Sequence, residues 1–271
     1  MQNPPRGRRR SERNPVAKAL RALGWLIQSP DADVGVRHVA GALDLRPSNA
    51  HRLLSTLVHE GFVQQDARTA RYSLGPELLR WAHLIIARAP LREIAMHHMR
   101  ALVGACNETA FLGLYDGARR EMMFAASVES EHPLRYAIEL NRWMPMNTGA
   151  SSLAVLAFLP KDELHAIFDR SLDGPPLTAN AITGRTRLNA ALAQVRRIGY
   201  AFSRGQRLAG AIGIAAPIFA SGGKVIGDLV LTIPEQRFER RNTGKLATLL
   251  RKRAAAITAD IGGAPPATEK R

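Results

Sequence analysis

The chain has 271 residues, with 38 Lys and Arg against 23 Asp and Glu, and a formal net charge of +15. This length suits one large domain or two ordinary ones and is ample for a buried core. The positive charge favours a polyanionic partner, with nucleic acid ahead of an anionic membrane surface. The single cysteine, Cys106, excludes an intramolecular disulfide framework and a cysteine-rich zinc site, and it favours a reducing compartment.

The sequence predicts neither a membrane span nor an export signal. It contains no run of about 18 apolar residues. The N-terminal stretch MQNPPRGRRRSERNP carries five arginines, and no uninterrupted apolar segment follows it as a signal peptide would require. We interpret residues 1–13 as a disordered basic arm and expect a cytoplasmic protein.

Residues 14–75 contain three apolar stripes at helical spacing, which predict helices over 16–27, 36–43 and 47–59. The last two helices are short and joined by a tight turn, an arrangement typical of a helix-turn-helix that presents its second helix outward. Residues 62–65 and 71–74 then predict a β-hairpin. Together these elements indicate a winged helix-turn-helix domain.

The third helix, within RPSNAHRLLSTLVHEGFVQQD, has two different faces. Its apolar face consists of Ala50, Leu53, Leu54, Leu57 and Val58. The opposite side and its flanks carry Ser48, Asn49, His51, Arg52, Ser55, Thr56 and His59. That polar side could approach a phosphate backbone, or it could be an ordinary solvated face. Charge does not decide between them, because residues 1–75 hold only twelve Lys or Arg against six Asp or Glu.

Beyond residue 75 the pattern mixes helices and strands and predicts an α+β fold. Residues 76–89 are apolar on nearly every side, as expected of a linker helix that packs against a second subunit. We expect helices up to Cys106 and over 161–168, 185–198 and 241–261, and another to 159 whose N-cap is Asn147 or Thr148. We expect strands over 110–115, 121–128 and 134–138, and two more, AIGIAAPIF and VIGDLVLTI, around a turn at 221–223.

The motifs that would mark an enzyme are incomplete. Residues 149–153 lack the last glycine of a Gly-x-Ser-x-Gly elbow, and Gly223-Lys224 lacks the upstream glycine of a phosphate-binding loop. The pair His97-His98 has no ligand partner at helical spacing, and we interpret it as a solvated surface pair. We therefore expect no catalytic residue, no metal site and no cofactor.

Several ordered blocks of the sequence resemble the IclR-type bacterial transcription regulators. The blocks are VAKALRALGWL, VRHVAGALDLRPSNAHRLLSTLVHEGFVQQD, RYSLGPELL, GYAFSRGQRLAGAIGIAAPIF and GKVIGDLVLTIPEQRF. The resemblance implies a winged helix-turn-helix over 14–75, a linker helix over 76–89, a GAF-like effector-binding domain with an antiparallel sheet over 90–262, and a disordered tail over 263–271. It also implies a dimer or tetramer that binds a double-stranded DNA operator.

The resemblance places Ser48, Asn49, His51, Arg52 and Ser55 on the recognition helix and Arg71 in the wing. Arginine can donate two parallel hydrogen bonds to guanine in the major groove, so we expect Arg52 to read a base directly. Serine and asparagine can reach phosphates or bases. His51 could instead be structural.

The resemblance also implies an effector pocket. We place there Ala150, Ser151, Ser203, Arg204, Gly213, Val230 and Thr232, with Arg207 nearby. Exposed amides at a helix N-terminus favour a carboxylate. A glyoxylate- and pyruvate-responsive branch has polar or acidic residues where this chain has Ser203, Gly213 and Val230, which favours an aromatic or larger carboxylate here. Ordinary core packing is the alternative for the late-strand residues.

The predicted function is a ligand-responsive, sequence-specific transcriptional regulator that controls a catabolic operon through a small organic acid. The alternative is a GAF-like sensor whose winged helix contacts another protein instead of DNA.

Overall fold

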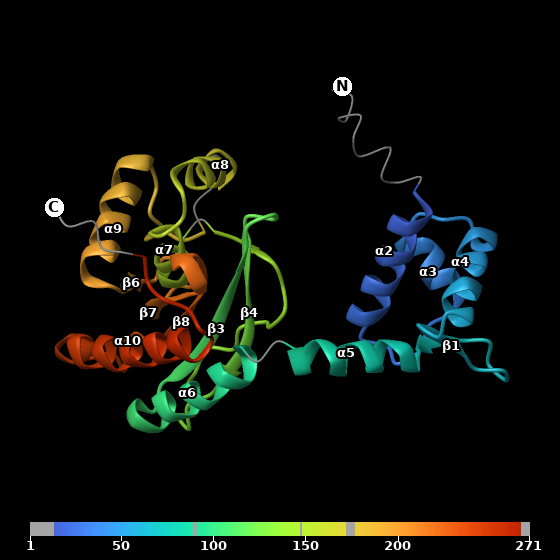
Figure 1. Ribbon diagram of the computed structural model, residues 1–271, viewed down its shortest axis with the longest axis horizontal. Coiled ribbons are helices and arrows are strands. Elements are labelled where there is room, and N and C mark those ends of the chain that lie inside the picture. Colours follow the sequence, from blue (N-terminus) through green and yellow to red (C-terminus); the bar gives the residue numbers. More distant parts are fainter. Residues whose placement is uncertain (1–13, 89–90, 147, 172–176, 267–271) are drawn as a thin grey trace. The chain divides into compact units, whose positions relative to one another are not determined.

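The computed structural model describes residues 14–88, 91–146, 148–171 and 177–266, and it divides into two compact units, 1–89 and 90–271 (Figure 1). Each unit is described by itself. The predicted basic arm, the possible cap Asn147 and residues 267–271 of the predicted tail lie outside the described residues.

The first unit consists of a three-helix head with a small wing, followed by helix α5. Its elements are α2 (Pro15–Gln28), α3 (Val36–Ala42), α4 (Pro47–His59), β1 (Val63–Gln65), β2 (Tyr72–Leu74) and α5 (Pro76–Arg88). Strands β1 and β2 pair antiparallel, and Val34 makes an isolated bridge to Tyr72. The core of the head gathers Ala22, Leu26, Val39, Leu54, Leu57 and Tyr72. The predicted helix-turn-helix and hairpin are confirmed.

The second unit is built on a six-stranded antiparallel sheet with the order β5-β4-β3-β8-β7-β6. Its strands are β3 (Thr109–Asp116), β4 (Glu121–Val128), β5 (Met144–Pro145), β6 (Ala201–Arg204), β7 (Ala211–Phe219) and β8 (Val225–Pro234). The strand predicted over 134–138 is wrong, because that segment forms no strand. Its Tyr136 hydroxyl instead donates to the carbonyl oxygen of Ala209, at 3.2 Å.

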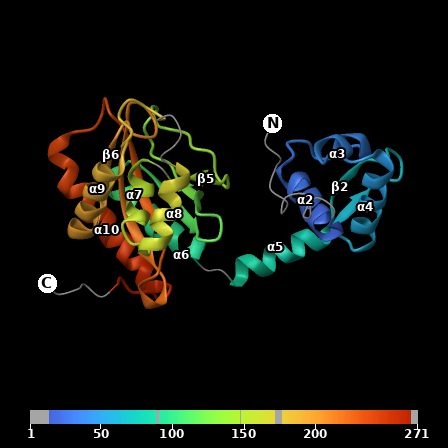
Figure 2. The ribbon, with the colours of Figure 1, turned by 90° about the horizontal axis from the view of Figure 1, so that it is seen from above.

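Helices cover both faces of this sheet (Figures 1 and 2). Helices α6 (Leu91–Cys106) and α10 (Thr243–Asp260) pack together on one face, and α7 (Ala150–Leu156) lies on the other with α8 (Lys161–Ser171) and α9 (Arg185–Ile198) outside it. Short 3-10 turns span Ser221–Gly223 and Arg240–Asn242. The α+β class is confirmed, and none of the described helices could cross a membrane.

The contact between α6 and α10 corrects the interpretation of the histidine pair. His98 is buried, and its Nε2 lies 2.8 Å from Oδ2 of Asp260. His97, one residue earlier, is exposed as expected. Periodicity placed the pair on a helix, but the side that α10 covers could not be known from a single stretch of sequence.

Candidate functional site

The predicted recognition surface lies on the outer side of α4. Ala50, Leu54 and Leu57 face the core of the head. The five predicted contact residues are exposed: Ser48, Asn49, His51, Arg52 and Ser55. The Arg52 guanidinium makes no hydrogen bond or ion pair within the described residues. The surface is therefore accessible to a ligand, and Arg52, near its centre, carries a charge that no described residue pairs with.

The wing holds its predicted arginine differently. Arg71 donates from Nε to Oδ1 of Asp33 at 2.5 Å and from Nη2 to the carbonyl oxygen of Asp33 at 2.7 Å. It thereby ties the wing to the loop before α3. Arg68, which sequence reasoning passed over, is exposed in the hairpin turn, where its backbone N–H donates to Oδ1 of Asp66 at 2.8 Å. The sequence signal that could have identified Arg68 is a basic residue inside a polar hairpin turn.

In the second unit, a cavity of about 60 Å³ lies between α7 and strands β6 to β8. Six of the seven predicted effector residues line it: Ala150, Ser151, Ser203, Gly213, Val230 and Thr232. Three of them form one row, because Ser203 pairs with Gly213 and Gly213 pairs with Thr232. The rest of the wall is largely apolar, including Met122, Phe124, Ile138 and Met144. A single ordered water needs roughly 10–15 Å³, so the cavity can hold more than one water-sized group.

Two backbone amides at the start of α7 are already bonded within the protein. The N-cap is Gly149, not Asn147 or Thr148, and the helix has seven residues. The Ala150 N–H donates to Ser203 Oγ at 3.1 Å, and the Gly149 N–H donates to Gln206 Oε1 at 3.3 Å. Since these side chains already accept hydrogen bonds from the Gly149 and Ala150 amides, these two amides are not available to a carboxylate.

Gly213 serves this capping arrangement instead of widening the cavity. A Cβ atom at this position would lie 2.8 Å from Ser203 Oγ and 3.0 Å from the Ala150 side chain. The missing side chain therefore lets β6 and α7 approach each other across β7. Gly213 therefore adds no room to this wall of the cavity for a larger carboxylate.

Arg207, in the loop after β6, is the basic group of the cavity wall. Its Nη1 is buried and has no hydrogen-bond partner within the described residues. Burial lowers the pKa of the guanidinium, which nevertheless remains charged. A buried N–H donor without a partner is costly, and an anionic ligand that accepts its hydrogen bond would offset that cost. The sequence drew attention to Arg207 only as a neighbour of the predicted pocket.

Asp228 lies behind the cavity wall and was not predicted. Its side chain is fully buried in β8, and neither carboxyl oxygen has a hydrogen-bond partner of good geometry among the described residues. Burial raises the pKa of Asp228 to about 7, against a smaller lowering effect of the Ser151 hydroxyl. A Cβ on Gly113 would lie 1.9 Å from Asp228 Oδ1, so this glycine leaves the space that the carboxyl occupies. An aspartate inside the apolar run VIGDLVLTI was the sequence signal.

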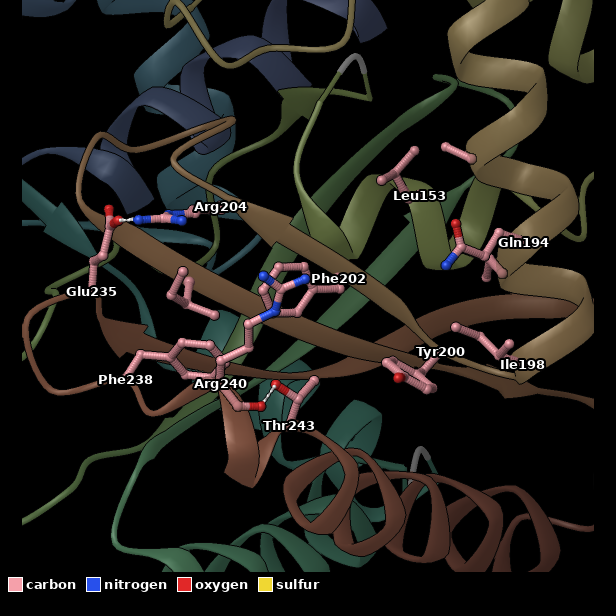
Figure 3. A pocket seen from close by; sticks show the side chains of 13 residues that line it. Leu153, Gln194, Ile198, Tyr200, Phe202, Arg204, Glu235, Phe238, Arg240 and Thr243 are labelled. Carbon is pink, nitrogen blue, oxygen red and sulfur yellow. Dashed lines mark hydrogen bonds and ion pairs between the residues drawn. The ribbon is translucent and has the colours of Figure 1, made fainter.

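Arg204 does not join the cavity. Along β6, Ser203 is buried whereas Phe202 and Arg204 are exposed, because successive side chains of a strand point to opposite faces. Arg204 donates from Nε to Oε1 of Glu235 at 2.6 Å. Figure 3 shows this pair at one end of a separate open groove of about 630 Å³, which also exposes Tyr200 and Phe238.

No group of three or more His, Cys, Asp or Glu within the described ranges could hold a metal ion. The arrangement is that of two binding surfaces, an exposed polar helix in one unit and a mostly apolar cavity with a buried arginine in the other.

Comparisons with known proteins identify the family of both domains. Residues 15–67 match the IclR helix-turn-helix domain, and residues 83–259 match the C-terminal domain of the bacterial transcriptional regulator IclR. The HTH-type transcriptional regulator XynR of Escherichia coli is 24% identical over 91% of this chain and 96% of its own length. The crystal structure of Thermotoga maritima IclR has a TM-score of 0.71, 26% identity, and coverage of 91% of this chain and 98% of that one.

A third relative shares the fold. An IclR homolog from Microbacterium hydrocarbonoxydans, solved in complex with 4-hydroxybenzoate, has a TM-score of 0.78, 23% identity, and coverage of 92% of this chain and 99% of that one. Because the two domain matches together span most of the sequence, the chain belongs to the IclR family of transcriptional regulators, as a non-enzymatic DNA-binding protein with an effector-binding C-terminal domain.

Proposed function

We propose that this regulator acts in the cytoplasm as a homodimer or tetramer. Residues 14–75 would bind the operator, residues 90–262 would bind a metabolite, and the helix over 76–89 would connect the two domains. In a dimer, two α4 helices would enter successive major grooves of an approximately palindromic site. Arg52 would contact a guanine, while Ser48, Asn49, His51 and Ser55 would contact phosphates or neighbouring bases. The exposed, uncommitted Arg52 carries this assignment.

The operator proposal is tested by incubating the full chain with sheared DNA of its source genome and sequencing the bound fragments. We expect a palindromic motif enriched near promoters of catabolic operons. Uniform recovery of fragments would contradict sequence-specific reading by α4. No binding at low salt would favour the protein-contact alternative for the winged helix.

We propose that the effector is a carboxylate whose anionic group binds Arg207 in the cavity beside α7. The buried, unpartnered Nη1 of Arg207 supports this, because a carboxylate would satisfy both its hydrogen-bonding capacity and its charge. The apolar side chains of Met122, Phe124 and Val230 would contact an aromatic or otherwise apolar body. 4-Hydroxybenzoate is a convenient first probe.

The test compares Arg207→Gln with Arg204→Gln by isothermal titration of the full chain. Removing one partner of a buried charge pair costs about 2–5 kcal/mol, so Arg207→Gln should weaken carboxylate binding at least about 30-fold. Arg204→Gln removes an equal charge outside the cavity and should leave the affinity within about threefold. Equal effects of the two variants would contradict a direct contact with Arg207.

Exposed apolar side chains in the first unit support self-association. Leu79, Trp81 and Leu84 on α5 are 63%, 46% and 43% exposed. On α2, Val16 and Leu20 are each 65% exposed. A second copy could cover such residues. Light scattering of a Leu79→Glu, Leu84→Glu double variant should show a smaller oligomer than the parent chain; an unchanged mass would contradict a role of α5 in assembly.

Effector binding would regulate transcription by favouring one arrangement of the paired heads over another. Only a ligand with different affinities for the two arrangements can do this, and such coupling is typically worth about 1–3 kcal/mol. Operator affinity measured with and without a bound carboxylate should therefore differ about 5- to 150-fold.

A further inference from the structure

The positive charge of the effector unit is concentrated in one stretch of the chain. Residues 185–260 contain 14 Lys or Arg against four Asp or Glu, a surplus of ten, whereas residues 76–184 contain ten against twelve. We infer that the exposed face of α10 is a second DNA-binding surface, which contacts phosphates beside the operator that the head binds. This inference adds to the proposed operator binding and rests on it.

The four acidic side chains of the stretch 185–260 are not available to neutralise its surface. Each of them is buried or already has a partner: Asp228 is fully buried, and Glu235, Glu239 and Asp260 lie within hydrogen-bond distance of Arg204, Arg241 and His98. The remaining cations of the stretch therefore keep their charge uncompensated by neighbouring carboxylates.

Helical spacing brings three of these cations to one face of α10. Lys245, Arg251 and Lys252 are exposed, and their side chains make no hydrogen bond or ion pair within the described residues. The opposite face, with Leu250 and Ala254, is buried. At 3.6 residues per turn the three cations lie within an arc of about 120°, and Lys245 and Lys252 are about 10 Å apart along the helix axis.

The end of α9 extends the same surface. A Cβ on Gly199, the residue that ends α9, would lie 3.0 Å from Nε of Arg251, so Arg251 lies against this turn. Arg197, two residues before Gly199, is exposed and has no hydrogen-bond or ion-pair partner in the part of the chain that the structure describes. We call the four side chains of Arg197, Lys245, Arg251 and Lys252 the α10 surface.

The residues between the cations favour DNA over a protein or a membrane. Gly244, Thr248 and Ala255 are exposed on the same face of α10, and this helix, described over its whole length, exposes no large apolar side chain. Protein interfaces depend on apolar and aromatic anchors, and membrane-binding helices insert an apolar face. A phosphate backbone requires only accessible positive charge, and the chain belongs to a family of DNA-binding proteins.

The experiment compares two duplexes with the full chain: the operator alone, and the same operator with about 20 base pairs of unrelated sequence on each side. Fluorescence anisotropy gives the dissociation constants over a range of salt concentrations. We expect the longer duplex to bind more tightly at low salt. Its log affinity should also fall more steeply with log salt, because additional phosphate contacts release additional counterions.

A double variant then assigns the additional contacts to α10. Arg251→Gln with Lys252→Gln should lower the salt slope on the longer duplex by about two for each protomer that contacts the flanks, and leave the slope on the operator alone unchanged. Glutamine has nearly the helix propensity of lysine and arginine, so the unfolding midpoint should stay the same.

The matched control is Arg120→Gln with Lys161→Gln. It removes the same charge from exposed positions in the turn between β3 and β4 and at the start of α8. We expect both salt slopes of this control to equal those of the parent chain. Equal effects of the two double variants would overturn the inference, because a general loss of positive charge would then explain both.

Two further outcomes would overturn the α10 surface and leave operator binding intact. One is a parent chain that binds both duplexes with the same affinity and salt slope. The other is a flank-dependent slope that survives Arg251→Gln with Lys252→Gln, which would assign the flank contacts to other residues.

Failure of the proposed operator binding is recognised separately, because the chain would then bind the operator no better than a random-sequence duplex. The two double variants are therefore also compared on a long random-sequence duplex, since phosphate contacts do not depend on sequence. There the α10 variant should lower the salt slope and the control should not, and equal slopes would overturn the inference.

Discussion

Neither Arg52 in the head nor Arg207 in the effector unit has a hydrogen-bond partner for its guanidinium among the residues that the structure describes, yet only one of the two is unusual. Arg52 is exposed on α4, where water satisfies its five N–H donors at no cost. The Nη1 of Arg207 is buried against a cavity. A missing partner is informative only where water is excluded. The head therefore shows where a ligand can bind, whereas the cavity also indicates which chemistry the ligand must have.

The same contrast separates the energetics of the two surfaces. Contacts of α4 with DNA would draw their strength from released counterions and would weaken as salt is added. Contacts inside the cavity are formed away from solvent and are screened much less. Substitutions at buried and exposed positions should thus differ in how much they change the binding free energy and in how strongly that change depends on salt.

The largest expected effect concerns the stability of the ligand-free protein at Asp228. Its pKa of about 7 in the folded chain lies above the ordinary value of 3.8. Below about pH 4 the carboxyl is neutral in both states and has no effect. As the pH rises to 7 the unfolded chain ionises first, so stability falls, by up to about 4 kcal/mol.

Asp228→Asn should remove this pH dependence. Chemical denaturation of both proteins between pH 4 and 8 measures it, and we expect the variant to gain stability relative to the parent chain across that range and then level off. A difference that is constant with pH would mean that Asp228 titrates normally. The uncharged amide carries its own desolvation cost, but that cost does not change with pH.

Arg52→Ala should have the next largest effect. We expect a loss of about 1–3 kcal/mol on operator DNA and a relaxed preference at one base position, measured by fluorescence anisotropy over a set of single-base variants. Because the Arg52 side chain contacts no hydrogen-bond or ion-pair partner in the described part of the chain, the variant should keep its unfolding midpoint. Unchanged discrimination among the DNA variants would refute base reading by this side chain.

The smallest effects are expected for substitutions of the two wing arginines, Arg68 and Arg71, which form a matched pair. Arg68→Ala should lower the slope of log affinity against log salt by about one while leaving stability unchanged. Arg71→Ala should do the reverse, with a loss of at most about 1 kcal/mol of stability, since the Asp33 pair is 40% and 50% exposed. A larger change in salt slope for Arg71→Ala than for Arg68→Ala would return the DNA contact to Arg71.

Sequence reasoning predicted the elements well where the hydrophobic period was long. The stripe through Ala50, Leu54 and Leu57 fixed the face of α4, and the nearly continuous apolar runs of β7 and β8, on either side of a glycine turn, located both strands. It failed at 134–138, where Ile138 packs against the core but Leu134 is 57% exposed and the segment forms no strand. Backbone pairing depends on a neighbouring strand, which a local pattern does not contain.

Most residues that line the cavity were predicted, but the positions of its polar groups were not. Family resemblance brought six residues to one cavity, yet it placed Arg204 there, although alternation along β6 turns Arg204 away from Ser203. Two amides at the start of α7 are also not free, because Gln206 and Ser203 accept their hydrogen bonds from distant parts of the chain. The orphaned groups of Arg207 and Asp228 could be recognised only once burial and partners were known.

The two edge strands of the six-stranded sheet affect the tendency of the protein to aggregate. On one side β5 is only two residues long and ends in Pro145, which has no N–H to donate. On the other, β6 has four residues and an outward Arg204 in an ion pair. Short strands, proline and charge at a sheet edge all discourage backbone pairing with the edge strand of another molecule. A protein with an exposed Phe202 on a border strand is thus protected against fibril formation, and copies of the effector unit should meet through helices and loops.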